Sequence, residues 1–329
     1  MYPMKAKEIF RTDKDIPVLS APMAGVTDHS FRTILLENGA DCVCTEMVSC
    51  KGLLYGNQKT FELIRTDGKM RTAVQLFGHE PSDFFKAIDI LQQRYDDILL
   101  FDINMGCPAP KIYKEGDGCA LLKDPGLAIK IVEAAKSVSS LPVTVKMRIG
   151  IDSSPYDYTG FASGLEKAGA DAVTVHGRTR EQFYSGSSDR NKIREIKEAL
   201  SIPVIANGDI FSEDDAVSML DETGADGIMI ARGMLGDPFI FGRIRDRFEG
   251  KVTLQPSPEE KTDVIRRQYL MAEEEKGEYT AIRELRKHLV WYVKGIRNAA
   301  SLRNRALSIE NRSELEEFLR ELLIRFREA

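Results

Sequence analysis

The sequence has few of the residues that mark secreted, zinc-binding or membrane proteins. Its 329 residues include five cysteines, an odd number without CxxC spacing, so neither a disulfide framework nor a structural zinc is expected. No run approaches the roughly 20 apolar residues of a membrane span, and the first residues form no signal-peptide stretch. We therefore expect a cytoplasmic protein with no metal and no membrane partner.

Negative charge exceeds positive charge until the chain nears its end. The net charge is −5, yet residues 251–329 hold 16 Lys and Arg against 14 Asp and Glu. Apolar residues make up 43% of the chain, enough for a sizeable core. A slightly basic tail on an acidic body indicates a partner that the body does not share.

Short apolar or β-branched segments alternate with helical patterns through the first 250 residues. The expected strands are Val18–Met23, Cys42–Val48, Thr72–Phe77, Ile98–Met105, Val143–Arg148, Ala172–His176, Val204–Gly208 and Gly227–Ala231. Glycines in ENGAD, EKAGAD and DETGAD end the helices between them, because the chain turns left-handed there. Eight such units predict an α/β fold, a (β/α)8 TIM barrel, as a catalytic domain over residues 1–250.

Beyond Gln255-Pro-Ser-Pro, which reads as a linker, only helical patterns remain. Helices are expected at 258–276, 279–297, 300–308 and 313–327. They predict a C-terminal all-helical bundle as a second domain over residues 251–329.

Polar side chains recur on one face of the expected strands, where alternate residues point into the barrel. They are Gln75, Asp102, Asn104, Thr144, Lys146, Arg148, Thr174, His176, Arg178 and Asn207. A barrel interior is normally apolar, so polar residues at the carboxyl ends of five strands favour a polar ligand. Gln75 or Thr174 alone is better explained as a core hydrogen-bonding group.

Two glycine-containing segments, ANGDIFS (206–212) and IARGMLGDP (230–238), follow the last two strands. Loops at these positions of a barrel often bind phosphate. Flavin mononucleotide (FMN) accounts for them, with Lys146 and His176 expected to place positive charge near its pyrimidine edge. Gly116 and Gly118 form no nicotinamide fingerprint, because the third glycine is missing.

Several motifs together resemble the tRNA-dihydrouridine synthase family, above all its bacterial B-type branch. They are APMAGVTDHSFR (21–32), VQLFG (74–78), INMGCP (103–108), DGCALL (117–122), VKMRIG (145–150), HGRTR (176–180), ANGDI (206–210) and RKHLVWYVKG (286–295). They span both expected domains. One departure is Ala231-Arg232, where the family usually has Gly-Arg, so that turn is less free.

The resemblance implies that uridine in tRNA is reduced to 5,6-dihydrouridine, with bound FMN as cofactor and NADPH as reductant. It implies that the residues contacting FMN are Pro22, Met23, Ala24, Gln75, Lys146, His176, Asn207, Gly208, Asp209, Ala231 and Arg232. It makes Cys107 the proton donor, and it places Asn104 and Arg178 on motifs that face the uracil.

Cys107 follows a strand end directly and is fixed by Pro108. When a hydride reaches carbon 6 of uracil, a proton must reach carbon 5. A thiol with a pKa near ~8.5 is mostly protonated at neutral pH and can give that proton. The commoner role of a free cysteine, a small buried apolar side chain, suits Cys42 and Cys44 on the second strand.

Five basic residues near the end fall on one side of a helix when spaced at 100° per residue. They are Arg283, Arg286, Lys287, Lys294 and Arg297. Such a stripe is more often a solvated face. Because acidic residues are nearly absent from it, we interpret it as a ridge that contacts tRNA phosphates.

Two other interpretations remain. An FMN barrel acting on a small pyrimidine, as a dihydroorotate dehydrogenase does, would not need the basic tail. A non-catalytic RNA-binding barrel would not need a flavin. A monomer is expected, and the sequence does not name the uridine that is modified.

Overall fold

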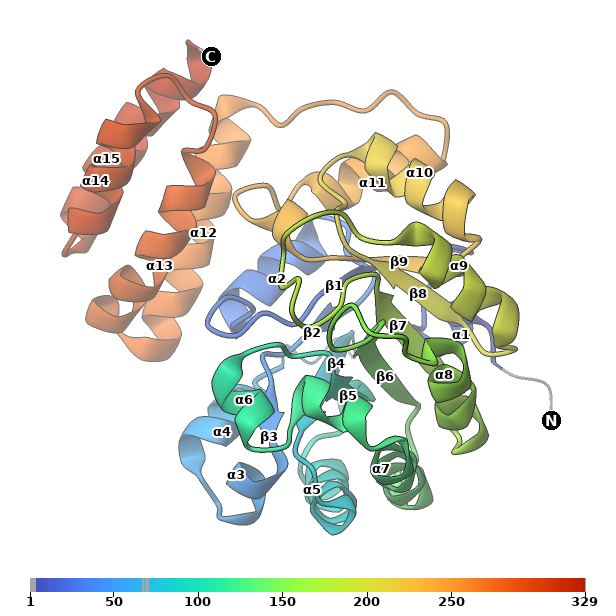
Figure 1. Ribbon diagram of the computed structural model, residues 1–329. Coiled ribbons are helices and arrows are strands. Elements are labelled where there is room, and N and C mark those ends of the chain that lie inside the picture. The colour runs from blue at the N-terminus through green and yellow to red at the C-terminus, as the bar shows by residue number, and fades with distance from the viewer. Residues whose placement is uncertain (1–3, 67, 69–70, 329) are drawn as a thin grey trace.

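The computed structural model describes residues 4–66, 68 and 71–328, and parallel strands alternate with helices along most of it (Figure 1). The strands are β1 (Val18–Ser20), β2 (Val43–Cys44), β3 (Val48–Ser49), β4 (Thr72–Phe77), β5 (Ile98–Met105), β6 (Val143–Arg148), β7 (Ala172–His176), β8 (Val204–Asn207) and β9 (Gly227–Ile230). All their ladders are parallel, in the order β1-β9-β8-β7-β6-β5-β4-β2.

The sheet closes on itself through a bridge between Leu19 and Cys42, which joins β1 to β2. β2 and β3 both pair with β4, so they are two parts of one barrel position. The single strand expected at 42–48 is therefore interrupted: Thr45 donates its hydroxyl to the Glu46 carbonyl (2.7 Å) and accepts the Gln75 amide (3.1 Å). Eight positions remain, and the expected (β/α)8 barrel is confirmed.

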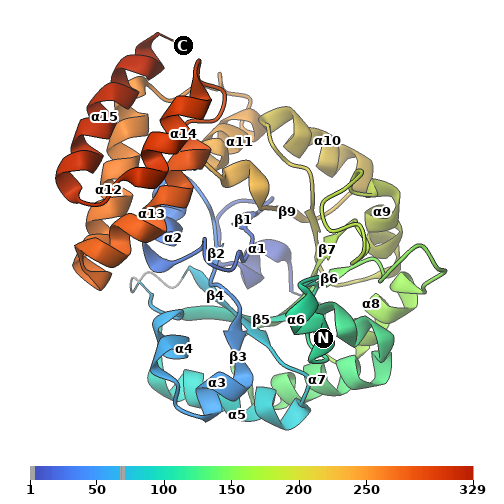
Figure 2. The same ribbon diagram turned by 60° about the vertical axis from the view of Figure 1, so that its left-hand side comes forward.

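Helices surround the barrel (Figure 2). They are α2 (His29–Glu37), α3 (Cys50–Leu54), α4 (Gln58–Glu62), α5 (Pro81–Arg94), α7 (Pro125–Val138), α8 (Tyr158–Lys167), α9 (Arg190–Ala199), α10 (Glu213–Thr223) and α11 (Ile240–Phe248), with α6 (Pro110–Lys114) and the 3-10 turns η1 (Gly118–Lys123) and η2 (Arg232–Met234) in loops. The outward strand residues Val143, Val145 and Met147 are fully buried in the core beneath the helices, as alternation predicts.

The amino-terminal mouth of the barrel is closed by apolar side chains. The short helix α1 (Ala6–Ile9) and Phe10 form one cluster with inward strand residues such as Leu99 and Ile205. Ligand access is therefore from the opposite end, where the carboxyl ends of the strands lie.

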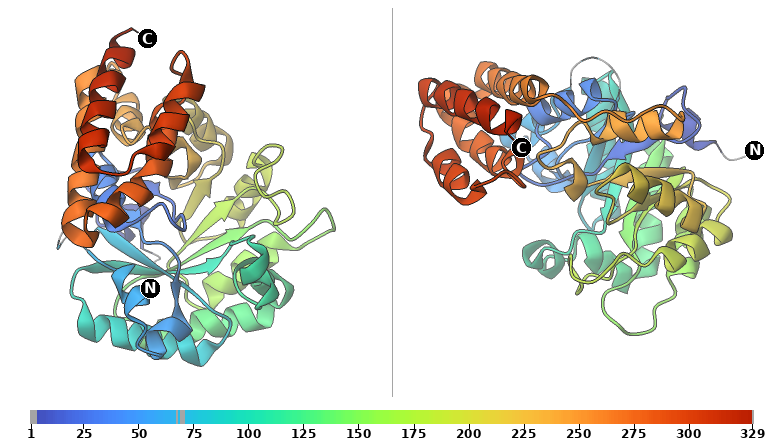
Figure 3. Two further views of the ribbon diagram at one scale, coloured as in Figure 1. Left: turned by 90° about the vertical axis from the view of Figure 1, so that its left-hand side faces the viewer. Right: turned by 90° about the horizontal axis from the view of Figure 1, so that it is seen from above.

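The tail forms four helices, α12 (Pro258–Lys276), α13 (Glu278–Tyr292), α14 (Ala299–Ser308) and α15 (Arg312–Arg327). They bury their own apolar cluster and lie to one side of the barrel (Figure 3). Ser257 and Glu260 form a capping box that starts α12, with Pro258 at its first position, an arrangement that favours a sharp helix start. The separate core supports two domains with a boundary near residue 250, which stays a proposal.

The helix expected at 279–297 ends earlier in the structure than predicted. α13 stops at Tyr292, and Gly295 (φ +85°) and Asn298 (φ +62°) then turn the chain left-handed. Such residues end a helix because the left-handed conformation cannot continue its hydrogen bonds. Lys294 and Arg297 therefore lie in the turn before α14 and do not continue a stripe on α13.

The helical bundle docks on the barrel through α12 and α2. Arg267 holds Glu37 with two hydrogen bonds of 2.5 and 2.7 Å, and Lys276 Nζ lies 2.6 Å from Asp28. At a second contact, Gly236 (φ +76°) lies so close to α13 that a β-carbon there would be 2.8 Å from the Tyr292 amide nitrogen. Among the described helices, none is long and apolar enough to cross a membrane.

Candidate active site

A cavity of about 290 Å³, the barrel cavity, opens at the carboxyl ends of the strands. Most of the residues expected to serve the site line it: Pro22, Met23, Ala24, Gln75, Asn104, Cys107, Lys146, His176, Asn207 and Ala231. Strand alternation brings the polar members together, since each lies at an inward-facing position of a strand or in the loop that follows it. Residues spread over more than 200 positions of sequence thus share one wall.

A narrow second cavity, the loop cavity, adjoins the first. The segments after β8 and β9 line it with Gly208, Asp209, Ala231 and Arg232, and His176 and Asn207 border both cavities. Gly208 has φ +122°, a value that L-residues rarely adopt. A side chain there would meet Ser188 and His176 within 3 Å, so glycine is required for the loop to pass this close.

A chain of hydrogen bonds leads from the barrel interior to the cysteine loop. Buried Asp102 accepts from Thr144 (2.6 Å) and from the Gln75 amide (2.7 Å). Gln75 in turn accepts from Asn104 Nδ2 (2.7 Å), and Asn104 Oδ1 accepts the Cys107 backbone amide (2.9 Å). Each polar group has a partner, so the chain fixes the side chains in one arrangement. Asn104 therefore positions the loop that carries Cys107.

The thiol of Cys107 is half-buried at the cavity wall. Burial raises its pKa, against smaller lowering effects of the Ala109 amide and of Arg148 and Lys146. Because the ordinary thiol pKa already lies above neutrality, Cys107 is protonated at neutral pH. It is suited to donating a proton, whereas a nucleophilic cysteine needs a lowered pKa.

The turn η1 packs directly on this loop. The Cys119 amide donates to the Cys107 carbonyl (3.1 Å), and a β-carbon on Gly118 (φ +59°) would lie 2.9 Å from the Cys107 β-carbon. Asp117, the residue before, is fixed by His79 Nδ1 at 2.7 Å. Gly118 thus allows η1 to pack closely against the Cys107 loop.

We expect Gly118→Ala to destabilise the protein more than Gly224→Ala does. Both glycines have a positive φ near +60°, but a side chain at Gly224 would meet nothing within 4 Å. Gly224→Ala should cost only backbone strain, about 1–2 kcal/mol, and Gly118→Ala a further 1–3 kcal/mol or so from crowding against Cys107. Denaturant unfolding of both variants measures the difference, and equal losses would show that the Cys107 loop moves aside freely.

Lys146 extends from β6 into the cavity and donates to Asn207 Oδ1 (2.9 Å). Asn207 is held in turn by the Met229 carbonyl, 2.7 Å from its Nδ2. Burial, and then the nearby Arg148, lower the pKa of Lys146 to about 8. An ammonium group under these conditions gains from any anionic ligand that enters the cavity.

The surroundings of His176 oppose the positive charge expected of it, which stays a prediction. Burial lowers its pKa far below the usual range, and Lys146, Arg148, Arg178 and Arg232 lower it further. An imidazole among four cations is neutral at physiological pH. His176 still borders both cavities, where a neutral ring can donate or accept one hydrogen bond on each nitrogen.

Arg178 was expected to face the substrate, but it lies outside the barrel cavity. It is 1% exposed, and it donates to both carboxylate oxygens of Asp209 (2.9 and 2.7 Å) and to the carbonyls of Ser185 and Gly186. Asp209 also accepts from Arg232 (2.8 Å). The guanidinium of Arg178 is thus engaged by protein acceptors, and its direct contact with the substrate stays a prediction. The residue joins the loop after β7 to the loop after β8.

Residues 19–327 match the family model described as dihydrouridine synthase (Dus). A probable tRNA-dihydrouridine synthase of Rickettsia bellii (strain RML369-C) is 38% identical over 289 residues, covering 87% of this chain and 88% of the relative. The tRNA-dihydrouridine synthase B of Pasteurella multocida (strain Pm70) is 38% identical over 281 residues, covering 85% and 84%. The chain belongs to the dihydrouridine synthase family.

Solved structures of low sequence identity share the fold of this dihydrouridine synthase family member. The 6-hydroxypseudooxynicotine amine oxidase (HisD) of Pseudomonas geniculata N1 matches 75% of the chain with a TM-score of 0.54 and 14% identity. Histamine dehydrogenase of Rhizobium sp. 4-9 matches 80% with a TM-score of 0.54 and 13% identity. The chain spans about half the length of each, 51%, and the likeness extends to the barrel fold alone.

The family expected from the motifs is thus confirmed, yet several cavity residues were missed. Arg148 lines the barrel cavity and holds its rim through the carbonyls of Gly106 (3.1 Å), Thr179 (2.7 Å) and Phe183 (3.0 Å). Alternation had placed Arg148 on the inward face without a role. Phe183 and Tyr184 also line the cavity from the loop after β7, and no sequence signal pointed to them because loop conformation sets their direction.

The basic residues of the tail differ in their surroundings. Arg286 is half-buried and donates to the Ile309 carbonyl at the end of α14 (2.8 Å), and Lys287 Nζ donates to the Gly25 carbonyl of the barrel. Arg283 is exposed beside Tyr279, and Lys294 and Arg297 are exposed in the turn after α13. Arg286 and Lys287 therefore have structural contacts of their own, and the other three have charges open to a ligand.

Proposed function

We propose that this protein reduces specific uridines in tRNA to 5,6-dihydrouridine, with FMN bound in the barrel and NADPH as reductant, as a monomer. The observation that carries the proposal is the protonated thiol of Cys107 on the wall of a cationic barrel cavity. Membership of the dihydrouridine synthase family and relatives named for tRNA support the substrate.

The cavities have the donors that an anionic flavin nucleotide needs. Lys146 borders the barrel cavity and Arg232 the loop cavity, at positions suited to the pyrimidine edge and the phosphate. Gly208 lets the loop after β8 pass close to Ser188 and His176, and backbone amides of such loops are the groups that bind phosphate. Asp209 serves by fixing Arg232 and Arg178. The bound flavin supplies the hydride.

The remaining chemistry belongs to the chain's own residues. Cys107 gives its proton to carbon 5 of the uracil, while Asn104 accepts the backbone amide of Cys107 and so fixes the loop that lines the cavity. Arg148 joins the cysteine loop to the loop after β7 through the carbonyls of Gly106 and Phe183, and Arg148 and Phe183 both line the cavity. A positioned acid of this kind contributes typically ~10²–10⁴-fold to a rate.

The main alternative is the reduction of a small free pyrimidine in the same cavity. The exposed cations Lys294 and Arg297, which lie outside the barrel cavity, have no use with such a substrate and favour tRNA. Purified protein should be yellow with bound FMN, and NADPH should bleach it without air. Unmodified tRNA should then restore the flavin absorbance. Restoration by free uridine or dihydropyrimidine precursors alone would refute the proposal.

We expect charge reversal at Arg283 and Arg297 to weaken tRNA binding while flavin reduction continues at the normal rate. Both side chains are exposed, and each lost phosphate contact should flatten the salt dependence by about 0.7–0.9 in slope. Filter binding over a range of salt concentrations measures both effects. Lys130→Glu, an exposed site on α7, is the matched control.

Arg286→Glu should behave differently. Its loss removes the contact with the Ile309 carbonyl, so the free energy of unfolding should fall, by about 1.5–3 kcal/mol for a hydrogen bond to a charged group.

If Arg283→Glu and Arg297→Glu leave both the tRNA affinity and its salt slope unchanged, the basic turn is only a solvated surface.

A further inference from the structure

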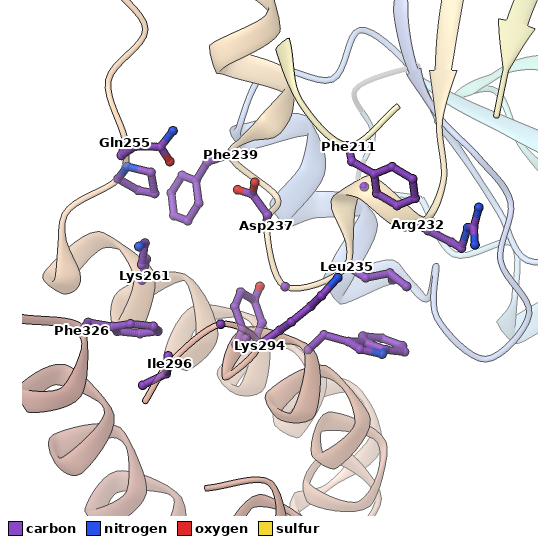
Figure 4. A pocket seen from close by; sticks show the side chains of 16 residues that line it. Phe211, Arg232, Leu235, Asp237, Phe239, Gln255, Lys261, Lys294, Ile296 and Phe326 are labelled. Atoms are coloured by element: carbon purple, nitrogen blue, oxygen red, sulfur yellow. The ribbon is translucent and has the colours of Figure 1, made fainter. Parts of the chain in front are cut away.

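A cavity of about 480 Å³ lies where the barrel meets the helical bundle. We call it the junction cavity. Figure 4 shows Phe211 and Phe239 on its barrel side, Lys261, Lys294 and Phe326 on its bundle side, and Gln255 on the linker between them. Phe211 and Arg232 border both this cavity and the loop cavity, so the two are neighbours without being the same site.

The junction cavity is positively charged. Lys261 and Lys294 have no carboxylate partner in the described part of the chain. The acidic residue of its wall, Asp237, accepts from Arg243 on both its oxygens (2.9 and 2.6 Å), and Arg243 also binds Glu213. An anion that enters would therefore meet two uncompensated ammonium groups.

The cavity also offers aromatic faces. Phe211 is 47% exposed, with the Arg232 guanidinium 5.3 Å from its ring centre, and Lys261 Nζ lies 5.1 Å from the ring centre of Phe326. Exposed rings beside cations are the surface on which proteins stack single-stranded bases. Tyr292, 4% exposed on the same wall, has a buried hydroxyl without a hydrogen-bond partner.

We propose that the junction cavity binds one unpaired nucleotide of the tRNA, separate from the uridine that is reduced. Lys261 and Lys294 hold its phosphate, and the aromatic walls receive its base. The proposal rests on the proposed function. The cavity lies within the size range of small-ligand sites, and the contact of Gly236 with α13 fixes its floor.

The continuation of charge beyond the cavity favours tRNA over the adenosine end of NADPH. Arg297 and Arg303 are exposed on the segment that leads away from Lys294 into α14. A row of cations that extends past a nucleotide-sized cavity suits a polyanion, because successive phosphates can each find a partner. A dinucleotide ends within the cavity and has no use for the rest of the row.

The test compares three variants with wild type. Lys261→Gln and Lys294→Gln each remove one charge, and Gln255→Trp fills the cavity from the exposed linker with the charge unchanged. Lys130→Gln on α7 is the control. The tRNA dissociation constant and its salt slope, the FMN affinity, and the KM for NADPH in flavin reduction are measured for each.

Each lysine variant should weaken tRNA binding about tenfold, the lower end for a charge-assisted hydrogen bond, and flatten the salt slope by about 0.7–0.9. Gln255→Trp should weaken tRNA binding with the salt slope unchanged, and the FMN affinity and the NADPH constant should stay at wild-type values in all variants. Wild-type tRNA affinity in all three, or a raised KM for NADPH instead, would overturn the proposal. A wild-type protein that tRNA fails to reoxidise would speak against the proposed function itself.

Discussion

Reduced Cys107→Ala protein is expected to be reoxidised by tRNA about 10²–10⁴-fold more slowly than wild type, the usual range for a lost general acid. Burial raises the pKa of the Cys107 thiol on the cavity wall, so it keeps its proton at neutral pH, and without it no side chain on the loop held by Asn104 can protonate carbon 5. Flavin binding and reduction by NADPH should persist, because the loop is held through the Cys107 backbone. Rapid mixing of anaerobically reduced enzyme with unmodified tRNA measures the step.

The controls use other cysteines and a second substitution. Cys107→Ser should not restore the rate, since a hydroxyl is far less acidic than a thiol, although it fills the same space. Cys42 lies in the apolar cluster at the opposite end of the barrel. Cys42→Ala should therefore lower the free energy of unfolding and leave the rate of reoxidation unchanged. A Cys107→Ala enzyme that reoxidises at the wild-type rate would make this cysteine a packing residue.

Lys146→Ala should weaken FMN binding by about one to two orders of magnitude. A hydrogen bond to a charged group is worth roughly 1.5–3 kcal/mol, and Lys146 is the ammonium group of the barrel cavity. Titration of flavin-free protein with FMN measures the loss. Lys123→Ala, an exposed lysine on η1, is the control, and unchanged affinity in Lys146→Ala would remove this lysine from the flavin site.

Because the pKa of Lys146 is lowered, the FMN affinity of wild type and of Lys146→Ala should depend differently on pH. The ammonium form donates the charged hydrogen bond to FMN, so FMN affinity should fall as the pH rises through about 8, and Lys146→Ala should lose this dependence. In the flavin-free protein the sign for stability is opposite. The unfolded chain binds more protons between pH 8 and 10.5, so the contribution of this group to the free energy of unfolding rises with pH in that window.

Strand periodicity was enough to predict the inward polar face. Gln75, Asn104, Lys146 and Asn207 were expected together because alternate residues of a strand share one side, and they do line one cavity. The ends of elements were less predictable. α13 stops at Tyr292 because the chain after it turns left-handed, and the helical spacing of the basic residues beyond gave no sign of this.

The charge states and ion pairs within the site could not be predicted from the sequence. Burial lowers the pKa of His176, and cations on β6 and in the loops after β7 and β9 lower it further. Arg178 is held away from the cavity because the loop after β8 presents Asp209 to it. Both outcomes depend on contacts between residues that are distant in the chain. Residue type and spacing describe only what each side chain can do alone.

At Gly236 the backbone of the barrel lies directly against α13, which fixes the spacing of the bundle and the barrel at that contact. No side chain fits between the two backbones at this contact. For tRNA bound across the bundle and the barrel as we propose, a base must be unstacked and extruded to reach Cys107, and that free-energy cost falls on the RNA. We therefore expect uridines in loops that deform readily to be reduced in preference to uridines in stacked regions.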